Sequence, residues 1–222
     1  MKKILHLLLI AGALGSISAH AQSKFEGAYG QIGIGYESVA PSTSTSVTYG
    51  GVGIPTNLNL SNSNSFAGTV TLGYAAAINK DFLLGIGAEY SPIAGQSQNM
   101  TVSLLGTTAS AGSYQKKNSY NVFISPGMAV GSDGLAYAKV GYTGASISID
   151  TGETTNYTGY SLGLGYKQFF SGNWYGFGEL NYASYGNQTS TQSAVVAGRT
   201  LTTSITSSAN VTNLLVGVGY KF

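Results

Sequence analysis

The side chains that most often carry out catalysis or bind transition metals, histidine and cysteine, are nearly absent from this sequence. It contains two histidines, His6 and His20, and no cysteine. Ser-His and Asp-His catalysis need an imidazole that takes a proton near neutral pH, and zinc sites use His or Cys ligands. A Ser-Lys pair stays formally open, and Asp150 and Glu153 are close enough in sequence to be weighed as a calcium site, although two nearby acids are usually just solvated. We predict no enzymatic activity, no metal and no cofactor.

Both histidines lie in a segment that is typical of a secretory signal peptide. Two lysines precede an apolar run over residues 4–15, and Ala19-His20-Ala21 is a small-x-small cleavage motif. The alternative is a retained helical anchor, but the apolar run is shorter than the ~20 residues of a membrane helix. We predict a cleaved signal peptide over 1–21 and a single exported domain over 22–222.

The composition indicates a surface that does not face water everywhere. Charged residues make up 8% of the chain, against about 25% in a typical soluble domain. The 16 tyrosines and 32 glycines also differ from a disordered chain, which is poor in aromatic residues. Without the two lysines of the signal segment, eight basic residues balance eight acidic residues. This balance gives no support for nucleic-acid binding.

Alternation of polar and apolar residues with a period of two, which is typical of β-strands, recurs along the chain. No helical period is sustained. Eight strands are predicted, each near or slightly above the 9–11 residues that a tilted strand needs to cross a bilayer. Their ranges are 26–38, 65–76, 81–92, 119–130, 135–147, 157–168, 174–185 and 212–222.

The connections between these strands alternate in length. The short ones are Ala77–Lys80, Gly131–Gly134 and Phe169–Asn173, which have the residues of tight turns. The longer ones are predicted as loops over 39–64, 93–118, 148–156 and 186–211. Short turns at one end and long loops at the other are typical of an outer-membrane barrel. The windows 43–60 and 189–211 also alternate, so they either extend the hairpins or form flexible loops.

The aromatic residues distinguish a membrane barrel from a soluble one, which would also alternate. On the apolar faces they gather at two heights with aliphatic residues between them. One girdle is predicted from Tyr36, Phe66, Tyr90, Tyr120, Tyr142, Tyr160 and Tyr182, and the other from Tyr74, Phe82, Tyr166, Trp174, Tyr220 and Phe222. Aromatic rings favour membrane interfaces. The sequence therefore predicts an all-β, eight-stranded, antiparallel up-and-down transmembrane barrel.

The C-terminal stretch Val216-Gly217-Val218-Gly219-Tyr220-Lys221-Phe222 carries a family resemblance. With the eight strands it resembles the small outer-membrane barrels of Gram-negative bacteria, a group that includes the OmpA transmembrane domain, OmpX and opacity-type porin-like proteins. The resemblance implies location in the outer membrane, contact with its lipids and lipopolysaccharide, and recognition by the barrel assembly machinery. The assembly signal would be Val216, Val218, Tyr220 and Phe222. An ordinary terminal strand is the alternative.

The polar faces place charged residues inside the barrel. The set comprises three acids and three bases: Glu37, Glu89, Lys139, Lys167, Glu179 and Lys221. Because charges in a narrow lumen must be paired or hydrated, we predict a network of ion pairs, with a charge-lined ion path as the alternative. In strand 174–185 the alternation also directs Tyr175 and Phe177 inward. Lys116, Lys117 and Arg199 are expected in solvated loops or against lipopolysaccharide.

Two functions follow from these expectations. An eight-stranded barrel leaves an interior that side chains just fill. This favours a structural or surface-interaction protein whose loops meet a partner. The alternative is a small porin for ions or small solutes.

Overall fold

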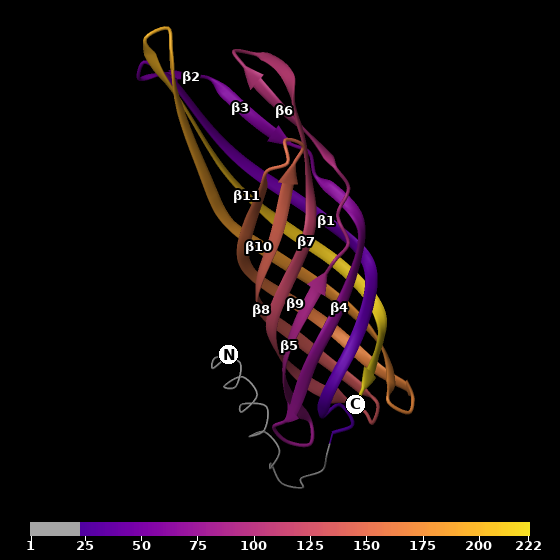
Figure 1. The fold of residues 1–222 in the computed structure, drawn as a ribbon. Coiled ribbons are helices and arrows are strands. Elements are labelled where there is room, and N and C mark those ends of the chain that lie inside the picture. Colours follow the sequence, from indigo (N-terminus) through magenta and orange to yellow (C-terminus); the bar gives the residue numbers. More distant parts are fainter. Residues whose placement is uncertain (1–22) are drawn as a thin grey trace, which may run out of the picture.

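The computed structural model describes residues 23–222, and most of them lie in antiparallel β-strands (Figure 1). The predicted signal peptide lies outside the described residues. In the described part, no helix is long and apolar enough to cross a membrane. The strands are β1 (Gly27–Tyr49), β2 (Val52–Ile54), β3 (Thr56–Leu60), β4 (Ser63–Ala77), β5 (Phe82–Ser91), β6 (Gln98–Leu104), β7 (Thr107–Val130), β8 (Gly134–Ile149), β9 (Thr154–Ser171), β10 (Trp174–Val196) and β11 (Arg199–Lys221).

Eight of these strands pair into a closed ring. Going round, the order is β1, β4, β5, β7, β8, β9, β10, β11 and back to β1. Closure leaves no unpaired strand edge in the hydrocarbon layer, where an unsatisfied backbone group is costly. The predicted eight-stranded up-and-down barrel is confirmed. The three short strands β2, β3 and β6 lie outside the ring and above it (Figure 1).

Most of the predicted long loops are β-hairpins that continue above the barrel. β1 runs on to Tyr49, β7 begins at Thr107, and β10 and β11 pair as far as Val196 and Arg199. Of the two alternatives left open for 43–60 and 189–211, the structure shows extended hairpins. The expectation of a loop over 93–118 is wrong for most of its residues, because β6 and the first part of β7 lie there. Only Asp150–Glu153 separates β8 from β9. In Figure 1 the ends of β10 and β11 rise beside β2, well above the ring.

Two-residue turns explain why the hairpins continue to their tips. The turns at Gly50-Gly51, Leu105-Gly106 and Ala197-Gly198 have positive φ at both residues. That geometry matches the right-handed twist of the flanking strands. At the opposite end, Asn79 fixes the turn between β4 and β5, because its Oδ1 accepts hydrogen bonds from the backbone N–H groups of Asp81 and Phe82 at 2.9 and 3.0 Å.

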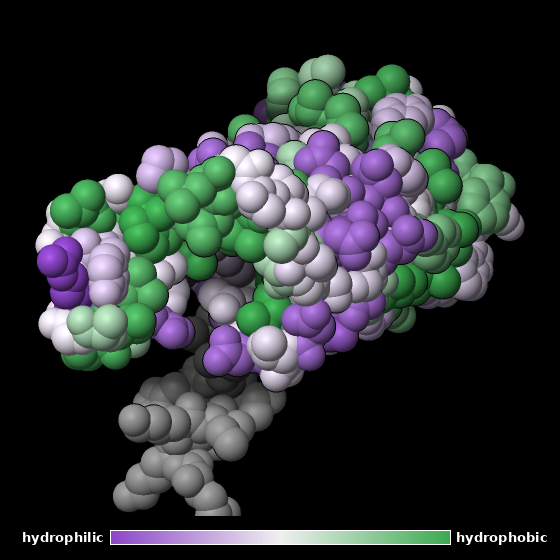
Figure 2. All heavy atoms as spheres, turned by 90° about the horizontal axis from the view of Figure 1, so that it is seen from above, coloured by the Kyte–Doolittle hydropathy of each residue, from purple (hydrophilic) through white to green (hydrophobic). Residues whose placement is uncertain are grey.

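The outer wall is apolar, and the predicted alternation sets it. On β11, Leu214 and Val216 are more than half exposed, whereas Leu215 between them is 0% exposed. The predicted girdle residues on β1 to β10 also point outward, with exposed fractions from 37% to 56%. Cross-strand pairs such as Tyr90 with Tyr120 join the residues of the first predicted girdle, the upper one, into a band. In the view from above, hydrophobic residues lie along much of the outline (Figure 2).

Inward-pointing rings are accommodated by glycines on the neighbouring strand. Tyr29 lies opposite Gly73, Phe123 opposite Gly87, Tyr137 opposite Gly165, Tyr175 opposite Gly219 and Phe177 opposite Gly217. A Cβ atom added at Gly73 would lie 2.5 Å from the Tyr29 ring, and one at Gly87 would lie 2.6 Å from Phe123. The glycines therefore give the rings space to lie flat against the wall, where they fill the lumen.

Candidate functional site in the barrel lumen

A cluster of three charges, the middle cluster, crosses the lumen at mid-height. Lys139 on β8 donates hydrogen bonds to Glu179 Oε2 on β10 at 2.9 Å and to Glu89 Oε2 on β5 at 3.0 Å. β5 and β10 lie on opposite sides of the ring. Lys139 and Glu179 are both 2% exposed. One ammonium group therefore ties two facing walls together.

Neutral side chains complete the hydrogen bonding of this cluster. Glu179 accepts hydrogen bonds from Tyr137 (2.5 Å), Gln31 (3.2 Å) and Asn181 (3.2 Å), and Glu89 accepts one from Thr71 (3.2 Å). Lys139 Nζ also lies 4.5 Å from the centre of the Phe123 ring. Buried charges are tolerated when their remaining hydrogen-bonding capacity is met in this way.

A second ion pair, the upper pair, lies nearer the end of the barrel where β1, β10 and β11 continue beyond the ring. Lys116 Nζ and Glu37 Oε2 are 2.5 Å apart, and both side chains are buried. The expectation that Lys116 is solvated is therefore wrong. An irregularity in the pairing of β7 with β8, between Lys116 and Asn118, shifts the alternation by one residue. Lys116 consequently points inward while Lys117 is exposed.

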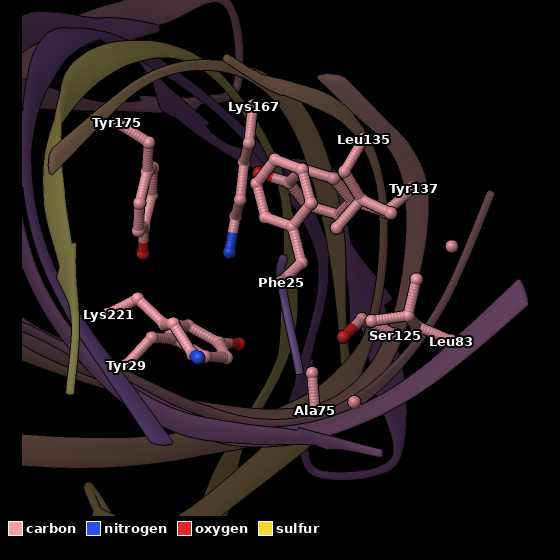
Figure 3. A pocket seen from close by; sticks show the side chains of 12 residues that line it. Phe25, Tyr29, Ala75, Leu83, Ser125, Leu135, Tyr137, Lys167, Tyr175 and Lys221 are labelled. Atoms are coloured by element: carbon pink, nitrogen blue, oxygen red, sulfur yellow. The ribbon is translucent and has the colours of Figure 1, made fainter. Parts of the chain in front are cut away.

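A layer of aromatic rings, the tyrosine layer, fills the opposite end of the barrel, where short turns join the strands. Lys167 Nζ lies 3.9 Å from the centre of the Tyr29 ring and 5.0 and 5.1 Å from those of Tyr137 and Tyr175. Within residues 23–222 Lys167 forms no ion pair. Electrostatic attraction to the ring faces stabilises a desolvated ammonium group. Figure 3 shows Lys167 and Lys221 pointing into one small pocket between these rings.

Two phenylalanines lie beside the tyrosine layer. The ring centres of Phe25 and Phe169 are 4.4 Å apart, and Phe169 meets Tyr175 edge-on at 5.7 Å. Next to them, Lys24 pairs with Asp133 in the turn between β7 and β8 at 2.5 Å. The hydrogen bonds that Lys24 and Ser132 donate lower the pKa of the Asp133 carboxyl.

The six predicted lumen charges thus fall into three places. Glu89, Lys139 and Glu179 form the middle cluster. Glu37 joins Lys116, which the sequence reasoning had left in a loop, while Lys167 and Lys221 lie in the tyrosine layer without a carboxylate. Tyr175 and Phe177 point inward as predicted, with exposures of 1% and 7%. Tyr29 and Tyr137 were not singled out, although both lie on the polar side of the alternation.

Small cavities lie between these layers in the part of the lumen that the structure describes. The pocket in the tyrosine layer holds about 20 Å³, and a polar cavity between the middle cluster and the upper pair holds about 40 Å³. A cavity needs roughly 10–15 Å³ of such volume to hold one water molecule. The pocket in the tyrosine layer can therefore hold one or two waters, and the polar cavity a few.

The residues of the predicted assembly signal lie along the outer wall, from Val216 beside Gly178 down to Phe222 at the rim. Val216 and Val218 face outward, and Phe222 is 69% exposed. Tyr220 is half-buried between Trp174 and Phe222, with ring centres 5.1 and 5.5 Å apart. Recognition of these four residues by the barrel assembly machinery stays a prediction.

Comparison with known proteins identifies the family. Residues 7–222 match the outer membrane protein beta-barrel domain family. The chain belongs to this family. This β-barrel family implies location in the outer membrane, and the resemblance that the sequence suggested is confirmed. No curated protein sequence matches the chain.

Solved structures of other outer-membrane proteins resemble this chain to different degrees. OprG from Pseudomonas aeruginosa aligns with a TM-score of 0.57 and 14% identity, covering 93% of this chain and 99% of that one. The outer membrane protease OmpT from Escherichia coli gives 0.49 and 10%, covering 94% and 99%. Neisserial surface protein A gives 0.48 and 17%, covering 89% and 98%. At 14% identity the likeness to OprG concerns the fold alone.

Proposed function

We propose that this outer-membrane barrel is a closed scaffold that holds an extended β-sheet above the membrane for interaction with a surface partner. The observation that carries the proposal is that three layers of side chains, one above another, block the lumen. The middle cluster ties opposite walls together, and the upper pair and the tyrosine layer lie above and below it. An open ion path would need all three layers to rearrange together.

The part of the molecule above the ring supports the display role. β1, β11 and β10 stay paired from the barrel to their tips, so they form a three-stranded sheet. Every residue from Gly186 to Thr200 is exposed. On rigid barrels, binding residues concentrate on such exposed connections.

The alternative is a narrow channel for ions or small solutes. The polar cavity beside the upper pair favours it, since Glu37, Glu89 and Lys116 line a space that can hold water. Conduction would require Lys139 to leave both carboxylates and the rings around Lys167 to part.

Electrical recording distinguishes the two functions. Residues 22–222 are refolded in detergent, their folding is checked by the gel shift between heated and unheated samples, and the protein is added to a planar bilayer. We expect no discrete conductance steps. Reproducible steps whose size depends on salt, and which change in Lys139→Ala, would establish the channel and overturn the closed scaffold.

A further inference from the structure

The sheet above the barrel carries a regular array of hydroxyl groups on its outward face. Three rows cross β1, β11 and β10 in register, and every one of their nine positions is serine or threonine. The rows are Ser44-Thr206-Thr189, Ser46-Ser204-Thr191 and Thr48-Thr202-Ser193. We call these nine residues the hydroxyl face. Rows lie two residues apart along the strands, so the array repeats about every 4.8 Å across the strands and about every 6.8 Å along them.

The opposite face of the same sheet has no such order. Its rows are Thr43-Ser207-Gln188, Thr45-Ile205-Ser190 and Val47-Thr203-Gln192. This inner face is also partly covered, because Thr43 donates a hydrogen bond to the Leu58 carbonyl oxygen on β3. The uniform composition of the hydroxyl face is therefore not a general property of these strands.

The hydroxyl groups are already oriented toward one another. Thr189 and Thr206 hydroxyls are 2.8 Å apart, and the two pairs in the next rows are each 3.0 Å apart. A hydroxyl group has one donor and two acceptor sites, so a paired hydroxyl can still bind a ligand. Because the side chains are held in place by their neighbours, binding costs less rotamer freedom.

The position of this face determines what it meets. It continues the outer wall of the barrel upward: on β1 the same alternation runs from Tyr36, in the upper aromatic girdle, to Ser44 and Thr48. Thr48 lies twelve residues beyond Tyr36, which is about 40 Å along a tilted strand. The face therefore looks sideways into the layer above the lipid headgroups, where the saccharides of outer-leaflet glycolipids stand.

The chemistry of the face favours saccharides over a protein partner. Protein interfaces are enriched in Tyr, Trp, Met and Arg, which anchor them in apolar pockets. The hydroxyl face contains none of these residues and no charge. Its hydroxyl groups can exchange hydrogen bonds with sugar hydroxyls, and its threonine methyl groups can lie against the apolar faces of sugar rings.

We propose that the hydroxyl face binds the neutral saccharide chains of the glycolipids that surround the barrel in the outer leaflet. This inference rests on the proposed function, because it needs the sheet to be held above the membrane. It also assigns a partner to the sheet: a saccharide layer in the same membrane.

Contacts between threonine methyl groups and sugar protons test the inference directly. Protein with labelled threonine methyls is placed in vesicles whose lipopolysaccharide carries complete saccharide chains, or only the lipid anchor. We expect solid-state NMR cross-peaks from sugar protons to Thr189, Thr191, Thr202 and Thr206 in the first vesicles and none in the second. Thr45 and Thr203, on the inner face, should show none.

Two matched variants separate the faces. The triple variant Thr189→Val, Thr191→Val, Ser193→Ala removes the outer hydroxyls of β10 and should abolish the sugar contacts of Thr202 and Thr206. The control Ser190→Ala, Gln192→Ala changes the inner face of the same strand and should leave them unchanged. Equal losses in both variants would overturn the inference.

Further outcomes keep the inference and the proposed function apart. Saccharide chains freed from lipid, added to vesicles that contain only lipid anchors, should restore few of the contacts. Full restoration would overturn the assignment to membrane glycolipids, and methyl contacts between two differently labelled copies would show a protein partner instead.

If Thr189–Thr206 contacts are present without sugar contacts, this inference alone fails. If those contacts are absent, the sheet is not formed and the display function fails with it.

Discussion

At the scale of single residues, Lys139 holds the most consequential position because it is the cation between two buried carboxylates. Replacing it with Met leaves Glu89 and Glu179 without a counter-charge in the lumen. Removing one partner of a buried ion pair typically costs about 3–5 kcal/mol. We expect Lys139→Met to lower the free energy of unfolding by this amount, measured by urea titration in lipid vesicles.

A double variant tests the reason for that loss. Adding Glu179→Gln to Lys139→Met removes one of the two uncompensated carboxylates, so part of the lost stability should return. The new amide at position 179 stays beside Gln31 and Asn181, whose side chains can bind an amide as well as a carboxylate. A double variant less stable than the single one would show that the charge imbalance is not the cause.

The turn that follows β7 gives a pH-dependent prediction. Lys24 and Ser132 donate hydrogen bonds to Asp133 and lower its pKa. A carboxyl whose pKa is lower in the folded state adds stability above its unfolded pKa, near 3.9, and loses it as the pH falls through the folded pKa. In Lys24→Gln we expect the NMR titration midpoint of the Asp133 carboxyl to rise toward its ordinary value. An unchanged midpoint would assign the shift to Ser132 alone.

At the scale of strands, the pairing of rings with glycines predicts which glycines cannot be replaced. In Gly73→Ala the new methyl group would lie 2.5 Å from the Tyr29 ring. Overpacking of this kind costs about 1–3 kcal/mol. Gly178→Ala is the matched control, because it lies on the outer face with nothing nearer than a backbone oxygen at 4.0 Å.

A double-mutant cycle in urea unfolding experiments completes this test. In Tyr29→Ala the ring is gone, so adding Gly73→Ala should cost much less than it does in the native protein. Independent sites would give additive losses. Additivity here, or a Gly178→Ala variant as unstable as Gly73→Ala, would contradict the explanation.

The strands that cross the membrane could be predicted from the sequence, because lipid outside and packed side chains inside impose a strict alternation. The inward orientation of Leu215 and Glu179 follows from that alternation. That of Lys116 does not, since the irregularity in β7 changes the parity next to it and leaves no residue signature. The hairpin extensions were left open because alternating Ser and Thr residues suit both strands and loops. The two-residue turn at Ala197-Gly198, which favours the strand, lacks the usual Asn-Gly or Asp-Gly signal.

At the scale of the molecule, the barrel and the sheet above it are joined through the same strands but stabilised by different contacts. The barrel has a filled lumen and a lipid-facing wall, whereas β10 beyond Tyr185 pairs with β11 only. Residues 186–208 should therefore be dispensable for folding. We predict that replacing them with an Asn-Gly turn between Tyr185 and Ala209, which are paired across β10 and β11, preserves the barrel.

The shortened protein should keep the heated-to-unheated gel shift and a urea midpoint close to that of the full chain. It should also stay silent in the planar bilayer, because the three closing layers all lie below the removed residues. A shortened protein that fails to fold would mean that the sheet and the barrel form one cooperative unit. Conductance from a folded shortened protein would mean that the extension, rather than the lumen side chains, closes the barrel.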